Sequence, residues 1–265
     1  MKRNCFKLYV CILSVGLAVC ACGVAQVETN KSLAKSDTPG GRNGTSDGAD
    51  MPLYKPRASL ELPVYKPKFR GAPVVRVAGS SRADGPDIKL LVIAPEHVGL
   101  TTQEQPSLYW YNSRPVKTKF ELTIVQKQKA APLLEFRLDS AAEVGIHQLP
   151  LADHNIKLAV DTEYRWIVAL VFDQDSRSRD VVASGMIKRI TPGEELKKRL
   201  AGAKPNELPF IYAEEGIWYD AISSLGDLIE AHPGNDLFHK QRAALLQQVG
   251  LGEAAMFDTQ RASAK

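Results

Sequence analysis

The sequence predicts a β-rich α+β protein in which an antiparallel β-sandwich is followed by a packed C-terminal α-helical region. Three observations predict this fold: a long hairpin pattern, several shorter alternating segments before it, and helix signals after it. The chain accordingly divides into four parts, namely a signal peptide (1–25), a disordered, proline-rich tether (26–69), a sandwich domain (70–191) and a helical region (192–265).

The hairpin at residues 163–190 is the strongest strand signal. Large apolar residues occupy every second position of its first strand: Tyr164, Trp166, Val168, Leu170 and Phe172. Successive side chains of a strand point to opposite faces, so this set predicts the core face. The polar residues 173–180 predict the turn. Gly185 in the returning strand predicts either a bulge or a close approach of another group.

Short alternating segments precede the hairpin at a spacing typical of a sandwich. With the hairpin they make about seven strands, and the five that come first are 88–94, 107–111, 119–126, 132–138 and 144–149. The number of strands and their aromatic positions resemble the immunoglobulin or fibronectin type III pattern. That resemblance concerns architecture alone.

Helix signals begin at Thr191-Pro192-Gly193-Glu194, which combines an N-cap hydroxyl, a proline at the first helical position and a glutamate three residues after the cap. This helix is expected to run to about Ala203. Later helices are expected at 206–215, at 216–231, and from a cap at Asn235 or Asp236 to an end at Gly250.

One helical phrase resembles the second half of a tetratricopeptide repeat. It is Gly-Ile-Trp-Tyr-Asp-Ala-Ile at 216–222, followed by Pro233. A repeat array needs about three units to be stable, and one is visible. We therefore expect these helices to pack on the sandwich in preference to forming a peptide-binding groove.

The N-terminus predicts export. Lys2, Arg3 and Lys7 precede the apolar run Leu8–Val19 and then small residues, which is the pattern of a secretory signal peptide. Two processing routes are open: cleavage after Ala25, or lipoprotein processing at Cys22, which would give the chain its membrane anchor. The expected location is the periplasm or cell envelope.

Charge and cysteine content exclude several classes of protein. Of the net charge of +4, three positive charges belong to the signal peptide, so the exported chain is close to neutral and has no electrostatic case for nucleic acid. The four cysteines all lie in the signal peptide, at Cys5, Cys11, Cys20 and Cys22. The exported domain therefore has no disulfide and no cysteine metal site.

The tether contains a duplicated phrase. Residues 52–57, Pro-Leu-Tyr-Lys-Pro-Arg, return as residues 63–68, Pro-Val-Tyr-Lys-Pro-Lys. Both copies predict extended or polyproline conformation. They are interpreted either as a docking peptide for a partner or, preferably, as a lead-in segment that lies on the domain.

Several phrases together resemble a family of exported bacterial proteins, Domain of Unknown Function 928. The resemblance covers roughly residues 65–252. It rests on Arg70-Gly71-Ala72-Pro73, Pro106–Tyr111, Gly145-Ile146-His147, Tyr164-Arg165-Trp166 and, most specifically, Tyr212–Ala221. It implies export and the two-part architecture. It implies no activity.

No catalytic or cofactor motif is present: the sequence has no Walker loop, no G-x-G-x-x-G, no G-x-S-x-G and no H-E-x-x-H. The five histidines (His97, His147, His154, His232 and His239) lack the spacing of zinc ligands. We expect no cofactor and no metal. The best acid or base candidates are Glu214, Glu215 and Asp220. Residues five or six positions apart do not lie well on one face of a helix, so a capping or packing role is favoured.

Tyr109 and Tyr111 lie two apart on one strand face. They can form a stacking platform for sugars, or be buried under the C-terminal helices, which is the preferred interpretation. The candidate ligand-binding residues are thus Tyr109, Tyr111, Glu215, Trp218 and Tyr219.

The sequence favours a non-catalytic envelope protein that acts as a protein-interaction module, with a protein partner of unknown identity. The first alternative is a carbohydrate- or cell-wall-binding module. The second is a hydrolase that uses the carboxylates of the helical region.

Overall fold

The structure is a computed structural model, which describes residues 61–68, 77–79, 87–129, 131–138 and 142–263. These residues lie within one compact unit, Lys55–Lys265. They form nine strands in two sheets, followed by five α-helices. The β-rich prediction with a C-terminal helical region is therefore confirmed.

The first sheet is antiparallel and four-stranded. Its order is β1 (Val77–Gly79), β2 (Lys89–Val92), β4 (Ser107–Asn112) and β7 (Gly145–Pro150). The second sheet is five-stranded and mixed, because β3 runs parallel to β9. Its order is β3 (Gly99–Thr101), β9 (Val181–Arg189), β8 (Glu163–Val171), β5 (Lys119–Gln126) and β6 (Pro132–Leu138).

The predicted hairpin is confirmed as β8 and β9, which pair in a regular antiparallel register. Trp166 lies opposite Gly185, and the register continues through this pair without a bulge. A Cβ at Gly185 would lie 2.8 Å from the Trp166 Nε1 and 2.9 Å from the Ala94 Cβ. Of the two interpretations of Gly185, the close approach is therefore the right one.

The first sheet lies between the second sheet and the helices, and β4 shows this best because five of its six residues are buried. On one face, the Trp110 ring lies 5.8 Å from the Phe120 ring of β5. On the other face, the Tyr111 ring lies 5.7 Å from the Phe257 ring of α5. Apolar residues of both sheets and of the helices form one continuous core.

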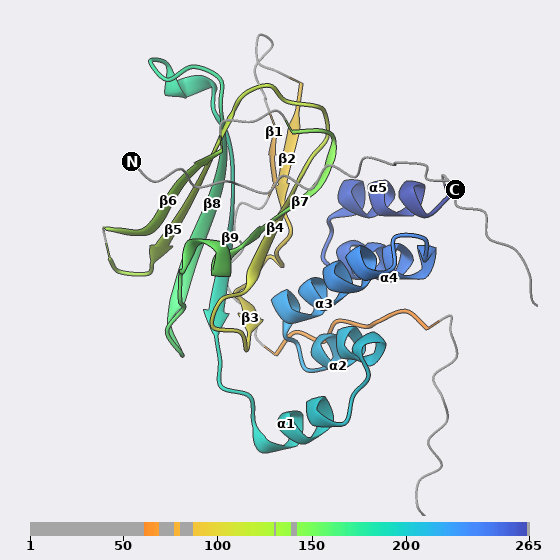
Figure 1. The fold of residues 1–265 in the computed structure, drawn as a ribbon. Helices are drawn as coiled ribbons and strands as arrows, with labels where there is room; N and C mark the ends of the chain where they lie inside the picture. Colours follow the sequence, from red (N-terminus) through yellow and green to blue (C-terminus); the bar gives the residue numbers. More distant parts are fainter. Residues whose placement is uncertain (1–60, 69–76, 80–86, 130, 139–141, 264–265) are drawn as a thin grey trace, which may run out of the picture. The chain divides into compact units, whose positions relative to one another are not determined.

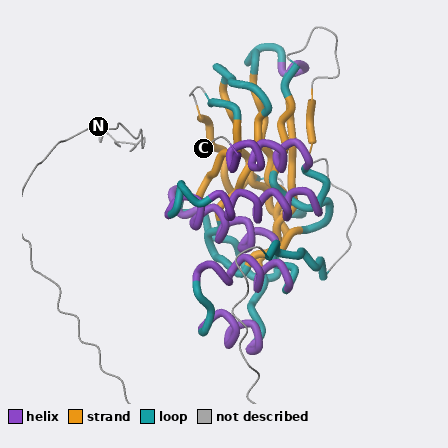
Figure 2. Tube along the Cα trace, turned by 90° about the vertical axis from the view of Figure 1, so that its right-hand side faces the viewer, coloured by secondary structure: helices purple, strands orange, loops and turns teal. Residues whose placement is uncertain are grey.

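The helical region consists of α1 (Glu194–Ala201), α2 (Leu208–Glu214), α3 (Trp218–Ala231), α4 (Asp236–Gln248) and α5 (Gly252–Ser263). Figure 2 shows the helices as successive rows, the upper ones in front of the strands and the lower ones below most of them. Three short 3-10 helices also occur, η1 (Leu151–His154), η2 (Arg177–Arg179) and η3 (Pro205–Glu207). Among the described helices, none is both long enough and apolar enough to cross a membrane.

The helix boundaries confirm some predictions and correct others. Asn235 caps α4, since its side-chain oxygen accepts a hydrogen bond from the Leu237 amide at 3.1 Å, and Gly250 after the helix has a positive φ of 75°. Thr191 is not a cap: α1 begins at Glu194, with Gly193 at the cap position. The chain leaves the sheet late because the Ile190 amide still donates to the Thr101 carbonyl at 2.8 Å.

The helix α5 was not predicted. Most of its buried residues are small, namely Ala254, Ala255 and Ala262, and its one buried charge is Asp258. This composition gives a weak apolar stripe, so the pattern of the sequence does not separate α5 from a loop.

Candidate functional site

The turn between α2 and α3 brings together three of the sequence-predicted site residues, Glu215, Trp218 and Tyr219. The other two, Tyr109 and Tyr111, lie on β4 beneath the helices. The sixth, Cys22, lies outside the described residues, as does the first copy of the duplicated phrase.

Trp218 and Tyr219 anchor α3 to both sheets. Trp218 is fully buried, and its Nε1 donates to the Ile93 carbonyl at 3.0 Å. The Tyr219 hydroxyl accepts from the Trp166 Nε1 at 2.8 Å and donates to the Met186 carbonyl at 3.0 Å. Burial raises the pKa of Tyr219. These two side chains therefore hold the framework of the site and present no free polar atom to a ligand.

Beside this turn lies an extended peptide from the start of the described chain, residues 61–68, which contains the second copy of the duplicated phrase. We call the surface that holds it the peptide groove. The groove is formed by Ala213 and Gly216 at the end of α2, Trp218 of α3, Gln241 and Gln248 of α4, and His97 of the β2–β3 loop. The preferred interpretation, a segment that lies on the domain, is confirmed for this copy.

Hydrogen bonds from the peptide groove reach the main chain of the segment. The Gln248 side chain makes two: its Oε1 accepts from the Tyr65 amide at 2.8 Å, and its Nε2 donates to the Pro63 carbonyl at 2.9 Å. The Gln241 Nε2 donates to the Glu61 carbonyl at 3.2 Å. The two glutamines are seven residues apart and share one face of α4. They bind the peptide as a neighbouring strand would.

A fourth main-chain hydrogen bond links the Lys66 amide to the Ala213 carbonyl at 3.0 Å. The next glycine, Gly216, allows this close passage: it has a positive φ of 69°, and a Cβ there would lie 2.5 Å from the Lys66 carbonyl oxygen. An L-residue at this position would be strained and would also collide with the peptide. Gly216 belongs to the phrase that resembles the family most specifically, so part of that phrase forms the peptide groove.

Tyr65 contacts the peptide groove through both its ring and its hydroxyl. Its ring lies edge-on to Trp218 with centroids 5.0 Å apart, and stacked against His97 at 5.9 Å. Its hydroxyl lies 2.9 Å from the His97 Nε2. Burial raises the pKa of Tyr65. In contrast, the preceding Val64 is 55% exposed, so its identity matters little for docking.

Glu215 closes one end of the peptide groove with charge. Its carboxylate pairs with Lys68 at 2.8 Å and with Arg199 of α1 at 2.7 Å. Its hydrogen bond with Lys68 is the main reason that the pKa of Glu215 is lowered, so it is ionised at neutral pH. Glu214 pairs with the same Arg199 at 2.8 Å. Both glutamates therefore act as ion-pair partners in this arrangement.

Asp220 is separated from these glutamates and is only 3% exposed. Its oxygens accept hydrogen bonds from the Thr101 hydroxyl and from the amide and hydroxyl of Thr102. Burial raises its pKa, and these hydrogen bonds lower it by less. Asp220 thus fixes the end of β3 to the first turn of α3, as a packing role requires.

Tyr109 and Tyr111 are 3% and 6% exposed, so neither ring offers an open face for stacking. Tyr111 packs on Phe257 of α5. Tyr109 packs against Gly226 of α3, where a Cβ would lie 2.6 Å from its hydroxyl oxygen. Burial raises the pKa of Tyr109, although the hydroxyls of Ser223 and Ser107 partly offset it. The Tyr109 hydroxyl makes no well-directed hydrogen bond to any described residue.

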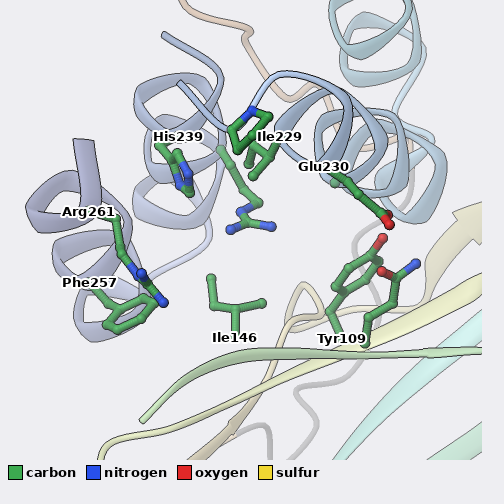
Figure 3. A pocket seen from close by; sticks show the side chains of 11 residues that line it. Tyr109, Ile146, Ile229, Glu230, His239, Phe257 and Arg261 are labelled. Carbon is green, nitrogen blue, oxygen red and sulfur yellow. The ribbon is translucent and has the colours of Figure 1, made fainter. Parts of the chain in front are cut away.

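This hydroxyl faces a cavity of about 540 Å³, which lies between the first sheet and helices α3, α4 and α5 (Figure 3). Its lining includes Tyr109 and Ile146 from strands and Glu230, His239, Phe257 and Arg261 from helices. We call it the helix–sheet cavity. No pattern in the sequence predicts it, because its strand residues and its helix residues lie 78 to 152 positions apart in the sequence.

A buried ionic cluster forms one wall of the helix–sheet cavity. The Arg242 guanidinium pairs with Asp258 through two hydrogen bonds, from Nε at 2.7 Å and from Nη2 at 2.8 Å. His239 Nδ1 lies 3.0 Å from the same carboxylate. Burial raises the pKa of Asp258, but the hydrogen bonds from Arg242 and His239 outweigh it, so the pKa is lowered. Sequence reasoning missed this cluster, since it needs α5.

The histidines do not converge. His97 belongs to the peptide groove, His147 stacks on Trp110, His154 lies beside Phe136, His232 lies beside Phe238, and His239 belongs to the ionic cluster. Within the part of the chain that the structure describes, no three His, Cys, Asp or Glu side chains lie close enough together to hold a metal ion.

Taken together, two sheets and a helical region with a docked peptide and a lined cavity define a two-part, β-rich protein. A sequence profile described as Domain of Unknown Function (DUF928) matches residues 75–258, and the chain belongs to this family. The predicted family is thereby confirmed. No curated protein matches the sequence. One solved structure, of a multi-domain immunophilin from Arabidopsis thaliana, covers 75% of this chain and 99% of its own, with 9% identity and a TM-score of 0.17. This likeness is too weak to carry an argument.

Proposed function

We propose that the protein is an exported protein-interaction module whose peptide groove binds extended peptides of the Tyr-Lys-Pro type. The observation that carries this proposal is the set of four hydrogen bonds between the groove and the main chain of residues 61–66. Main-chain recognition supplies affinity for an extended peptide, and one aromatic pocket, here filled by Tyr65, supplies selectivity.

The chain's own segment is the first occupant of the peptide groove. A tethered peptide competes at an effective concentration on the order of millimolar, so a partner must displace it or bring several copies of the phrase. Four net hydrogen bonds contribute on the order of 2–6 kcal/mol before the cost of ordering the peptide. The docked segment is therefore held weakly enough to exchange.

A binding assay tests this function. A fluorescent peptide of sequence Glu-Leu-Pro-Val-Tyr-Lys-Pro-Lys is titrated into the full chain that carries Tyr54→Ala and Tyr65→Ala, which weakens both internal competitors. We expect saturable anisotropy, and a loss of at least about tenfold in affinity when Gln248→Ala is added. The control peptide has alanine in place of tyrosine. Equal binding of the two peptides, or none at millimolar concentration, would refute the proposal.

The finer features of the fold belong to the same proposal. We interpret the two facing sheets as an immunoglobulin- or fibronectin III-like sandwich, supported by the two-sided burial of β4. The helices are interpreted as tetratricopeptide-like, supported by the helix pair α3–α4 whose α4 face holds a peptide. Both interpretations describe how a rigid scaffold can present the groove.

Export and location are part of the proposal and rest on residues 1–25 alone. The protein is placed outside the cytoplasm, in the periplasm or cell envelope. The mass of the mature N-terminus tests this: acylation of Cys22 would establish a lipid anchor, and a free Gln26 would establish a released protein. Retention of the first 21 residues would contradict both.

The two alternatives fare differently in this geometry. A carbohydrate-binding role now has to use Tyr109 through the helix–sheet cavity, since both tyrosine rings are covered. A hydrolase would need Glu214, Glu215 or Asp220 to act while each is bound to a guanidinium or to threonine donors. Turnover of ester or glycoside substrates that Glu215→Gln abolishes would establish the latter.

A further inference from the structure

The helix–sheet cavity is lined by polar groups whose hydrogen-bonding capacity the fold does not fully use. Tyr109 is 3% exposed, and its hydroxyl lines the cavity without a well-directed hydrogen bond to any described residue. A buried hydroxyl of this kind costs stability unless water or a ligand satisfies it. Gly226 in the middle of α3 makes room for it, although glycine is a poor helix former.

The opposite wall offers a guanidinium. Arg242 is buried, and its Nε and Nη2 are taken by Asp258. Asp258 does not take the remaining Nη1, and Arg242 lines the cavity. A second guanidinium, that of Arg261, lies over the Phe257 ring at 5.5 Å from its centroid. Arginine side chains placed in this way bind carboxylates well.

The charges are separated across the cavity. In Figure 3, Glu230 and Tyr109 lie on one side, and Arg261 and Phe257 lie on the other. Arg242 and Asp258 neutralise each other, and Glu230 offsets Arg261, so these four side chains together carry no net charge. A simple anion or cation would leave one end uncompensated, whereas a zwitterion matches both ends.

We propose that the helix–sheet cavity binds a small zwitterion, of the class of free α-amino acids. Glu230 and the Tyr109 hydroxyl oxygen receive the ammonium group. Arg261 and the Nη1 of Arg242 receive the carboxylate. Ile146 and Phe257 line the apolar space between them. A cavity of about 540 Å³ lies within the range of about 300–1,000 Å³ for small-molecule sites.

Calorimetric titration of the full chain tests this proposal. The twenty free amino acids are titrated one at a time, and the tightest is repeated as its N-acetyl derivative and as its methyl ester. We expect binding at millimolar affinity or better for at least one amino acid. Each blocked form should lose at least about tenfold. Absence of binding by all twenty at 10 mM, on the order of the weakest useful affinity, would overturn the proposal.

Matched variants assign the two ends. Glu230→Gln should lower the affinity for the free amino acid at least about tenfold. It should leave the affinity for the N-acetyl derivative unchanged, because that form has no ammonium group. Arg261→Gln should weaken the free amino acid and leave the methyl ester unchanged. Tyr109→Phe should weaken the free amino acid by less. The control is Glu253→Gln on α5, which pairs with Lys89 away from the cavity.

Two results would contradict this assignment: Glu230→Gln and Arg261→Gln weaken the binding of the free amino acid, its N-acetyl derivative and its methyl ester equally, or they weaken none of them. Either result would show that the ammonium is not bound by Glu230 and the carboxylate is not bound by Arg261. The residues of this site are not those of the peptide groove, so the result is independent of the proposed function. The doubly substituted Tyr54→Ala, Tyr65→Ala chain should bind the amino acid as the wild type does.

Discussion

At the residue scale, the most constrained atoms are those of one buried relay. The Trp166 indole donates to the Tyr219 hydroxyl, which donates to the Met186 carbonyl, and Gly185 lies against the indole. Position 219 requires a tyrosine because its hydroxyl must both accept from the indole and donate to the carbonyl. Position 185 requires a glycine because a Cβ there would collide with the indole. Removing one group leaves another buried and unsatisfied.

Tyr219→Phe is therefore expected to lower the free energy of unfolding by about 2–4 kcal/mol, since the Trp166 indole and the Met186 carbonyl both lose a partner. Urea denaturation measures this. The control is Tyr164→Phe, whose hydroxyl accepts one hydrogen bond, from the Ala159 amide at 3.0 Å; about 1 kcal/mol is expected there. Equal losses for the two variants would contradict the relay.

Asp258 gives a pH-dependent prediction. Asp258→Asn leaves the buried Arg242 without its carboxylate and should cost about 3–5 kcal/mol at pH 7. Its folded pKa is lower than the ordinary value of 3.8, so its contribution is complete above pH 3.8 and is lost as pH falls through the folded pKa. The stability difference between wild type and variant should accordingly shrink below pH 3.8, as urea titrations from pH 7 to pH 3 would show.

The control for this variant is Glu253→Gln on the same helix. Its partner Lys89 is exposed, so a much smaller loss of stability is expected, with little change in the pH profile. A constant difference between wild type and Asp258→Asn across the whole pH range would mean that folding does not shift the pKa of this carboxylate.

At the element scale, what the sequence predicts well is periodic and local. The β8–β9 hairpin, the cap at Asn235 and the end at Gly250 each follow from a few neighbouring residues. The predicted start of α1 at Thr191 was wrong, because a hydrogen bond from the Ile190 amide to the Thr101 carbonyl keeps the chain extended. The helix α5 was missed because alanines form its buried face.

The candidate site shows the same division. The phrase around Gly216 was recognised, but its role requires Lys66, some 150 residues earlier. Tyr65 and Gln248 are 183 residues apart, and no local pattern can pair them. The sequence predicts that Tyr109 and Tyr111 share one face of a strand, because they lie two residues apart. It predicts that C-terminal helices cover this face, but not which of them. Contacts between distant segments are what the sequence does not reveal.

The duplicated phrase gives a prediction about an element. Every contact of residues 63–68 can be repeated by residues 52–57, with Tyr54 for Tyr65 and Arg57 for Lys68. The exchange would lengthen the connection to β1 from eight residues (69–76) to nineteen (58–76). Loop closure then costs roughly 0.8 kcal/mol more.

Tyr65→Ala alone should therefore destabilise the protein by about 0.8 kcal/mol at most, because the first copy replaces the second. Tyr54→Ala should have no effect. The double variant should lose about 1.5–3 kcal/mol, the value for burying one large side chain. Urea denaturation of the four proteins forms a complete cycle. Additive losses, with Tyr65→Ala as severe as the double variant, would show that the copies do not exchange.

At the scale of the whole molecule, the sheets and the helices share one core. The predicted boundary at residues 191 and 192 separates strands from helices, but the core runs across it, from Trp166 and Phe120 to Trp218 and Leu245. The β4 face under the helices carries Tyr109 and Tyr111, which would both be uncovered if the helices were absent. The shape of the peptide groove therefore depends on the sheets that hold α3.

This shared core predicts a single cooperative unfolding transition for residues 61–263. Fluorescence, which reports on Trp110, Trp166 and Trp218, and far-ultraviolet circular dichroism, which reports mainly on the helices, should give coincident urea curves. A fragment that ends at residue 191 should fail to fold, because it loses Trp218 and Tyr219 and exposes the aromatic face of β4. The control is removal of residues 1–50, which should leave the midpoint unchanged. Two separated transitions, or a folded fragment 61–191, would instead establish that the sheets form an autonomous domain and that the helices are an addition to it.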